Sequence, residues 1–231
     1  MRGSIVWLSE RDSPDAFPPV ERALREPDGL LAAGGDLSPT RLLAAYRRGI
    51  FPWYSPGQPI LWWCPDPRAV LIPQELRTTR SLSKSIRNKG MQTRIDTDFE
   101  AVIEACGSEE IRPGGTWLSP EMRAAYLRLH QLGHAHSVET WVGDRLVGGL
   151  YGVAIGSVFF GESMFSRERD ASKVALRRLC DHLVDRGFHM IDCQMATAHL
   201  MSLGARLLPR ADFIASLERY ASLDASEQRF A

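Results

Sequence analysis

The chain has 231 residues, 44% hydrophobic and 24% charged, which is the composition of a soluble globular protein, and it shows neither a membrane-length apolar run nor the apolar core of a signal peptide. Its 28 basic and 28 acidic residues cancel, so net charge neither favours nor excludes a nucleic-acid partner. The four cysteines have no Cys-x-x-Cys spacing, which argues against a zinc site or a disulfide framework and favours the cytoplasm.

The first segment is rich in turn signals. Proline and glycine residues frame a short apolar piece, Leu30–Ala33, which we expect to lie among turns. A helix is predicted to follow, because Ser38 can cap it and Pro39 suits its first position. Leu42, Leu43 and Tyr46 give this helix an apolar face, and Gly49 ends it.

The run from Ile50 to Pro67 holds three of the six tryptophans and five of the fourteen prolines. Because proline breaks both helices and strand ladders, we expect an ordered loop stiffened by proline and clamped by aromatic rings. Two interpretations stay open. The loop is either a packed connection between domains or an aromatic wall on which a base or a side chain stacks.

A short strand is expected over Ala69–Ile72, and the segment after it is basic, with no acidic residue between Glu75 and Lys89. Its cations form either a solvated helix face or a patch for phosphates. These cations are Arg77, Arg80, Lys84, Arg87 and Lys89.

The middle of the chain predicts a strand over Met91–Ile95 and a helix from the cap Asp98 to about Cys106. A glycine-containing loop then delivers Trp117 ahead of a helix that Ser119 caps and Gly133 terminates.

Next comes a predicted hairpin, His136–Val142 and Arg145–Ile155, with a third strand over Ser157–Gly161. Glycines inside the second strand indicate a bulge or a close approach to the backbone; they are Gly148, Gly149 and Gly152. A helix over Ala171–Arg186, a strand over Phe188–Gln194 and two short helices near Ala198–Leu203 and Ala211–Ala221 complete the chain.

Two segments carry chemistry. Glu162 follows an apolar strand closely, so its carboxylate needs a partner. One interpretation pairs it with Arg167 at a strand-to-helix turn. The other places it in a cleft with Asp192 and Gln194, which strand alternation puts on one face.

Antiparallel strands followed by strand, helix and strand predict an α+β protein. The topology of the second part of the chain admits a mixed-sheet fold of the N-acetyltransferase-like (GNAT) type. The chain lacks a serine-hydrolase elbow, a Gly-x-Gly-x-x-Gly or P-loop nucleotide motif, and metal-ligand spacing around His130, His134 and His136. At Ser166–Ala171 it also lacks the glycines of a coenzyme A pyrophosphate loop, so we expect neither cofactor nor metal.

Eight strings of residues resemble the leucyl/phenylalanyl-tRNA–protein transferase family, and they are too rich in composition for chance agreement. They are Gly29–Ala32, Gly34–Pro39, Arg48–Trp53, Trp62-Trp63 with Pro65–Arg68, Gly115–Trp117, Leu132–Ser137, Gly161–Arg167 and Ile191–Gln194. One departure is Leu179, where relatives have a phenylalanine in the pocket.

The resemblance implies a small N-terminal α/β domain over residues 1–68 beside a GNAT-like domain over residues 69–231. It implies an enzyme that transfers Leu or Phe, and less well Met, from aminoacyl-tRNA to proteins with N-terminal Arg or Lys, which marks them for degradation. It implies that Trp53 and Trp117 stack about the terminal adenosine, that Glu162 meets the acceptor end, and that Asp192 and Gln194 act at the amine. In this interpretation Asp192 orients the amide of Gln194, and the proton of the amine goes to Gln194, to a tRNA 2′-hydroxyl or to water. Leu150, Phe159, Leu179 and Ile191 are either plain core or the end of a side-chain pocket.

Two other functions stay open: a coenzyme-A-dependent N-acyltransferase, and a non-catalytic module that binds a tRNA end or a protein N-terminus.

Overall fold

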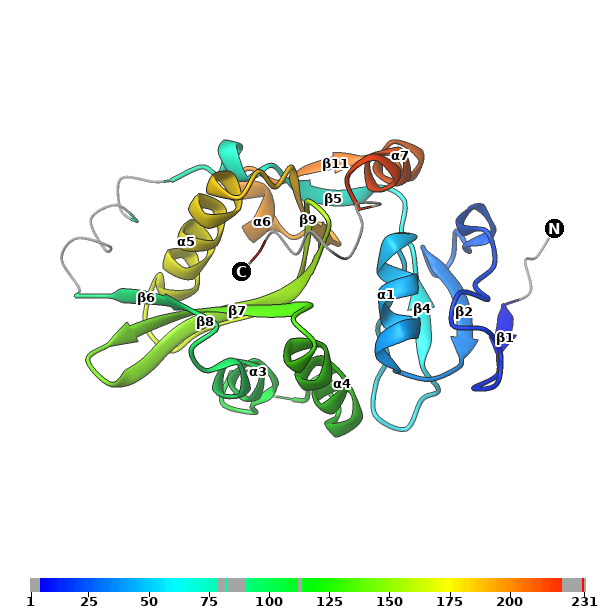
Figure 1. Cartoon of the computed structure of the whole chain (residues 1–231), viewed down its shortest axis with the longest axis horizontal. Coiled ribbons are helices and arrows are strands. Elements are labelled where there is room, and N and C mark those ends of the chain that lie inside the picture. Colours follow the sequence, from blue (N-terminus) through cyan, green and yellow to red (C-terminus); the bar gives the residue numbers. More distant parts are fainter. Residues whose placement is uncertain (1–4, 79–81, 83–89, 112–113, 222–229, 231) are drawn as a thin grey trace.

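The computed structural model describes residues 5–78, 82, 90–111, 114–221 and 230, which build two β-sheets (Figure 1). The smaller sheet has the strand order β1 (Val6–Leu8), β2 (Leu30–Gly34), β4 (Leu61–Trp63), β3 (Phe51–Pro52). The larger has the order β11 (Arg206–Leu208), β5 (Arg68–Leu71), β10 (Met190–Gln194), β9 (Val158–Ser166), β8 (Arg145–Ile155), β7 (Ala135–Val142), β6 (Gln92–Ile95).

The helices cover these sheets. They are α1 (Pro39–Arg47), α3 (Phe99–Gly107), α4 (Pro120–Gln131), α5 (Ala171–Asp185), α6 (Ala198–Ser202) and α7 (Arg210–Tyr220), with 3-10 turns at Val20–Arg22 and Pro73–Glu75. Figure 1 shows α5 on one face of the β7–β8 region and α3 and α4 on the other, and each of these helices packs against strands of the large sheet.

The predicted hairpin and third strand form the antiparallel centre β7, β8 and β9. From β9 the chain crosses through α5 and returns in β10, which pairs parallel to β9. This mixed sheet confirms the α+β class. Whether residues 1–68 and 69–231 fold as separate domains stays a prediction, and the proposed boundary falls at the start of β5, since Arg68 already pairs in the large sheet.

The small sheet adds to one expectation and corrects another. The apolar piece Leu30–Ala33, expected between turns, forms strand β2, and the proline-rich run, expected to be a loop, contains β3 and β4. Its prolines do not break the sheet, because β4 has none and Pro52 lies in β3, which is an edge strand where a missing N–H is tolerated. β1 and β11 are short strands that the sequence did not indicate.

The predicted helix starts are confirmed by their caps. The side chains of Ser38, Asp98 and Ser119 each accept a hydrogen bond from a backbone N–H three residues later. These bonds satisfy donors that the first helical turn leaves free. The caps place Tyr46 in α1 and Tyr126 in α4 on buried faces.

Both strands that carry the predicted site contain a bulge. In β9, Gly161 and Ser163 pair with Gly152 and Tyr151, so Glu162 is the extra residue. In β10, Asp192 and Gln194 pair with β5 and Cys193 is extra. The close approach expected at Gly152 is confirmed, because a Cβ there would lie 2.2 Å from the Phe160 carbonyl oxygen. A bulge changes the direction in which nearby side chains point, and these two bulges turn Glu162 and Gln194 toward one cavity.

Candidate active site

Glu162 is the centre of a hydrogen-bonded cluster. Its Oε1 accepts from the Tyr46 hydroxyl at 2.7 Å and from Gln194 Nε2 at 2.9 Å, and its Oε2 accepts from the Tyr126 hydroxyl at 2.6 Å. The two tyrosine oxygens also lie 2.7 Å from each other. Four elements, α1, α4, β9 and β10, thus converge on one carboxyl group.

This environment raises the proton affinity of the carboxyl group. Burial raises the pKa of Glu162 to about 7, and the negative charge of Asp192 acts in the same direction, while hydrogen bonds from Tyr126, Tyr46 and Gln194 oppose it. Burial and the neighbouring Glu162 also raise the pKa of both tyrosines well above the ordinary value. Both hydroxyls therefore keep their protons at neutral pH.

The interpretation that pairs Glu162 with Arg167 is wrong. Arg167 Nε lies 3.3 Å from Glu110 Oε2, and its guanidinium carbon lies 5.4 Å from the Phe165 ring centre. The cause is the length of β9, which runs to Ser166 and carries Arg167 away along the strand.

Asp192 has a different partner from the one expected. Its Oδ1 and Oδ2 accept from Arg68 Nε at 2.8 Å and Nη2 at 2.7 Å, and both side chains are fully buried. Phe51 and Phe213 sandwich the guanidinium, with ring centres 4.8 and 4.7 Å from its carbon. This is a bidentate ion pair in an apolar setting.

The expectation that Asp192 orients the Gln194 amide is therefore wrong. Asp192 Oδ1 accepts the backbone N–H of Gln194 at 2.9 Å, and the side-chain amide reaches Glu162 instead. Strand alternation fails here, because the bulge at Cys193 and the positive φ of 61° at Gln194 turn the last residue of β10. Asp192 thus fixes the backbone of Gln194, and Glu162 fixes its side chain.

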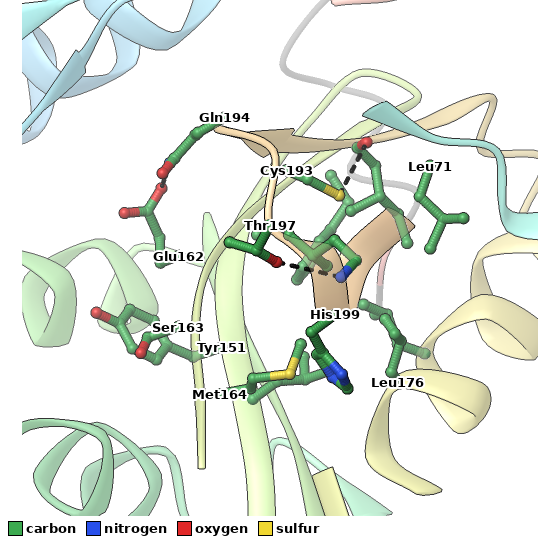
Figure 2. Close-up of a pocket in the computed structure, with 16 residues that line it drawn as sticks. Leu71, Tyr151, Glu162, Ser163, Met164, Leu176, Cys193, Gln194, Thr197 and His199 are labelled. Atoms are coloured by element: carbon green, nitrogen blue, oxygen red, sulfur yellow. Dashed lines mark hydrogen bonds between the residues drawn. The ribbon is translucent and has the colours of Figure 1, made fainter. Parts of the chain in front are cut away.

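One cavity of about 260 Å³ adjoins this cluster. Glu162 and Gln194 line it together with the four residues proposed as a side-chain pocket, Leu150, Phe159, Leu179 and Ile191. Figure 2 shows Glu162 and Gln194 pointing toward each other at one side of it and Leu176, Met164 and His199 on the opposite side. The structure brings these predicted residues together, and their role in binding stays a prediction.

A second, wider cleft of about 820 Å³ lies between the loops that carry Trp53 and Trp117. Trp53 is 39% exposed and Trp117 is half-buried. The Nε1 of Trp63 donates to the Trp53 carbonyl oxygen at 2.6 Å, which holds the backbone of this aromatic wall. Exposed indole rings beside a cleft suit base stacking.

Four of the five cations predicted to bind phosphates, Arg80, Lys84, Arg87 and Lys89, lie outside the described residues. Arg77 is described and exposed, and its backbone N–H donates to the Leu203 carbonyl oxygen. Within the described part of the chain no helix is long and apolar enough to cross a membrane, and no three metal-ligating side chains form a group.

The sequence interpretation missed Arg68, Tyr46 and Tyr126. Arg68 follows a proline-rich string, Tyr46 belongs to the predicted apolar face of its helix, and no motif in the sequence singles out Tyr126. The available signal was chemical, since a buried tyrosine hydroxyl or guanidinium needs a polar partner.

Two family models match the chain. The model for "Leucyl/phenylalanyl-tRNA protein transferase" matches residues 70–218, and that for its N-terminal domain matches residues 35–66. Leucyl/phenylalanyl-tRNA–protein transferases from Aromatoleum aromaticum and Azoarcus sp. are 63% and 62% identical, each over 94% of this chain and 91% of the relative.

Solved structures are more distant. The chain is 12% identical to a GCN5-related N-acetyltransferase from Kribbella flavida, with TM-score 0.41 over 74% of this chain and 61% of that one. It is 13% identical to the C-terminal domain of a putative lysylphosphatidylglycerol synthetase from Agrobacterium fabrum, with TM-score 0.42 over 84% and 62%. Scores this low support no assignment.

Proposed function

Because this chain belongs to the leucyl/phenylalanyl-tRNA–protein transferase family, we propose that it transfers leucine or phenylalanine, and less well methionine, from aminoacyl-tRNA to a protein α-amino group. The acceptors begin with Arg or Lys, and the new N-terminus marks them for degradation in the cytoplasm. The observation that best supports this is one cavity lined by Glu162, Gln194 and an apolar wall.

The chemistry demands little of the protein. An aminoacyl ester is already activated, and a protein α-amino group has an unperturbed pKa of about 7.7–8.0, so a useful fraction is neutral at physiological pH. Holding amine and ester together contributes up to about 7–11 kcal/mol to lowering the barrier. The site therefore needs positioned polar groups more than a strong base.

We assign the residues accordingly. The apolar cavity takes the donor side chain, Trp53 and Trp117 hold the terminal adenosine, and Gln194 meets the acceptor amine. Glu162 orients Gln194 through the 2.9 Å hydrogen bond, and Asp192 holds the Gln194 backbone. The basic segment from Arg77 to Lys89 contributes phosphate contacts, which carry affinity more than specificity.

The test is a transfer assay with leucyl-tRNA and peptides that begin with Lys, Arg or Ala. We expect product with Lys and Arg and little with Ala. Product from acetyl-coenzyme A in place of charged tRNA would instead identify an N-acyltransferase. Binding of charged tRNA without turnover would identify a non-catalytic module.

Donor choice depends on Leu179, which is 1% exposed and lines the cavity. An apolar pocket discriminates by only about 1–3 kcal/mol per methylene, so it grades donors by size. Leu179→Phe should fill the cavity and shift the ratio of kcat/KM several-fold toward leucyl-tRNA over phenylalanyl-tRNA.

The matched control is Leu183→Phe, which adds the same volume on the same helix at a buried position outside the cavity lining. If both variants showed the same ratio of kcat/KM for leucyl-tRNA and phenylalanyl-tRNA, Leu179 would not be part of the side-chain pocket.

A further inference from the structure

The hydroxyls of Tyr46 and Tyr126 and the carboxyl of Glu162 form a closed triangle. Its three sides measure 2.7, 2.7 and 2.6 Å, and each is a hydrogen-bond distance between two oxygens. Each side needs one proton, and the two hydroxyls supply only two. An ionised Glu162 leaves one pair of oxygens facing each other without a proton, whereas a protonated Glu162 supplies the third.

We propose that Tyr46 and Tyr126 are positioning residues of the transfer reaction, which with an uncharged Glu162 close a ring of three hydrogen bonds and thereby hold the amide of Gln194. The inference deepens the proposed function and rests on it. The three protons can run either way round the ring, because each hydroxyl donates once and accepts from the other side.

The surroundings favour the uncharged form. Among the described ion pairs none involves Glu162, and Arg68, the buried cation close by, is bound to Asp192. A half-buried carboxylate without a cation beside it is costly to ionise, and it takes up a proton instead. The raised pKa of Glu162, about 7 through burial and the charge of Asp192, agrees with the proton count.

The ring sets the orientation of Gln194. Its Nε2 donates to Glu162 Oε1, which turns the nitrogen side of the amide toward β9 and leaves the carbonyl oxygen as the acceptor for a ligand. An acceptor amine can donate an N–H to that oxygen. Since an amide oxygen is too weakly basic to take the proton, Gln194 orients the amine and does not deprotonate it.

An uncharged Glu162 also keeps the acceptor reactive. A neighbouring carboxylate would stabilise the ammonium form, and only the neutral amine attacks. In the transfer the nitrogen bonds to the carbonyl carbon, and the bond from that carbon to the ribose oxygen breaks. The proton that nitrogen loses ends on that ribose oxygen, and Glu162 keeps its own proton throughout.

The decisive variant is Glu162→Gln, whose amide keeps one acceptor and one donor and so preserves the ring. At pH 7 we expect Glu162→Ala to lose about tenfold or more in kcat/KM, and Glu162→Gln to recover most of that loss. The wild type should lose activity on the alkaline side as Glu162 ionises, and Glu162→Gln should not. A tenfold loss in a folded Glu162→Gln would overturn the proposal, because the carboxylate charge would then be required.

A second measurement does not depend on activity. Carbon-13 NMR of labelled glutamate carboxyls should show Glu162 protonated at pH 6. Tyr46→Phe and Tyr126→Phe each remove a hydrogen bond to the carboxylate, so each should move the titration to higher pH and lower kcat with little change in KM for charged tRNA.

Tyr220→Phe is the control and should leave the titration unchanged. Tyr220 lies on α7, its ring packs at a tilt against His189, and it is not one of the hydrogen-bond donors to Glu162. A Glu162 that stays ionised at pH 6 would refute the ring even if the enzyme transfers normally. Absence of transfer in the wild type would refute the proposed function and leave the titration readable.

Discussion

Asp192 and Glu162 lie on neighbouring strands of one sheet, and the protein neutralises the two carboxyl groups by different means. Asp192 pairs with Arg68, and both side chains are fully buried in a bidentate contact between two phenylalanine rings. Glu162 has two tyrosine hydroxyls and an amide around it. A charge balanced by a cation stays a charge, whereas a carboxyl among neutral donors is balanced most simply by a proton.

The two carboxyl groups differ in what balances them, which is a permanent cation for Asp192 and an exchangeable proton for Glu162. Arginine does not lose its proton over the range in which proteins stay folded, so the cation that pairs with Asp192 is permanent. The ionisation of Glu162 falls near neutral pH, where the acceptor amine also titrates. Asp192 therefore has a structural role, whereas the protonation of Glu162 makes the site depend on pH.

The largest effect should follow from breaking the ion pair. Asp192→Ala leaves the Arg68 charge buried and unpaired, which should lower the free energy of unfolding by about 3–5 kcal/mol in urea denaturation. The double variant Arg68→Met with Asp192→Leu should recover most of that loss. Equal losses in the single and double variants would show that packing, and not charge, dominates there.

A smaller effect should appear in the pH dependence of stability. The pKa of Glu162 rises from 4.5 to about 7 on folding, so its contribution to stability is fully present below pH 4.5 and is lost as pH rises through 7. At about 1.4 kcal/mol per pKa unit, reduced for the partial exposure of Glu162, the loss is about 2 kcal/mol.

Glu162→Gln lacks this titration, which makes it the reference. The difference in unfolding free energy, wild type minus Glu162→Gln, should fall between pH 4.5 and pH 8 and stay level above it. A flat difference would mean that Glu162 ionises as easily in the folded chain as in the unfolded one.

The smallest effect links the two regions. The negative charge of Asp192 raises the pKa of Glu162, so Asp192→Asn should lower the pH at which Glu162 titrates. The amide oxygen in Asp192→Asn can still accept the backbone N–H of Gln194, which keeps that contact. An unchanged carbon-13 titration midpoint would show that Arg68 already screens Asp192 completely.

Local sequence signals predicted much of the fold. Caps at Ser38, Asp98 and Ser119 located three helices, and the turn Gly143-Asp144 between two strand-forming runs located the hairpin of β7 and β8. Alternation failed at Gln194 because a bulge depends on the partner strand, which local sequence does not contain. Proline in the run from Ile50 to Pro67 hid β3 and β4, since its cost depends on whether a strand lies at an edge.

The site was predictable only in part for the same reason. The sequence pattern singles out Glu162 and Gln194, because polar residues after buried strands need partners. Their partners come from remote elements: Tyr46 lies 116 residues from Glu162, and Arg68 lies 124 residues from Asp192. A tyrosine on an apolar helix face has the same local pattern whether it packs or donates.

The contacts of Glu162 and Asp192 join residues from different segments of the chain, which bears on genes that encode only one of these segments. The two family models divide the chain between residues 66 and 70, yet Tyr46 lies before the division and Glu162, Tyr126 and Gln194 after it, while Arg68 falls in the gap. A gene that kept only the longer segment would encode the residues that line the apolar cavity, without the hydroxyl that closes the triangle and without the cation for Asp192. Detection of that segment alone in a genome therefore should not be taken as evidence of a working transferase.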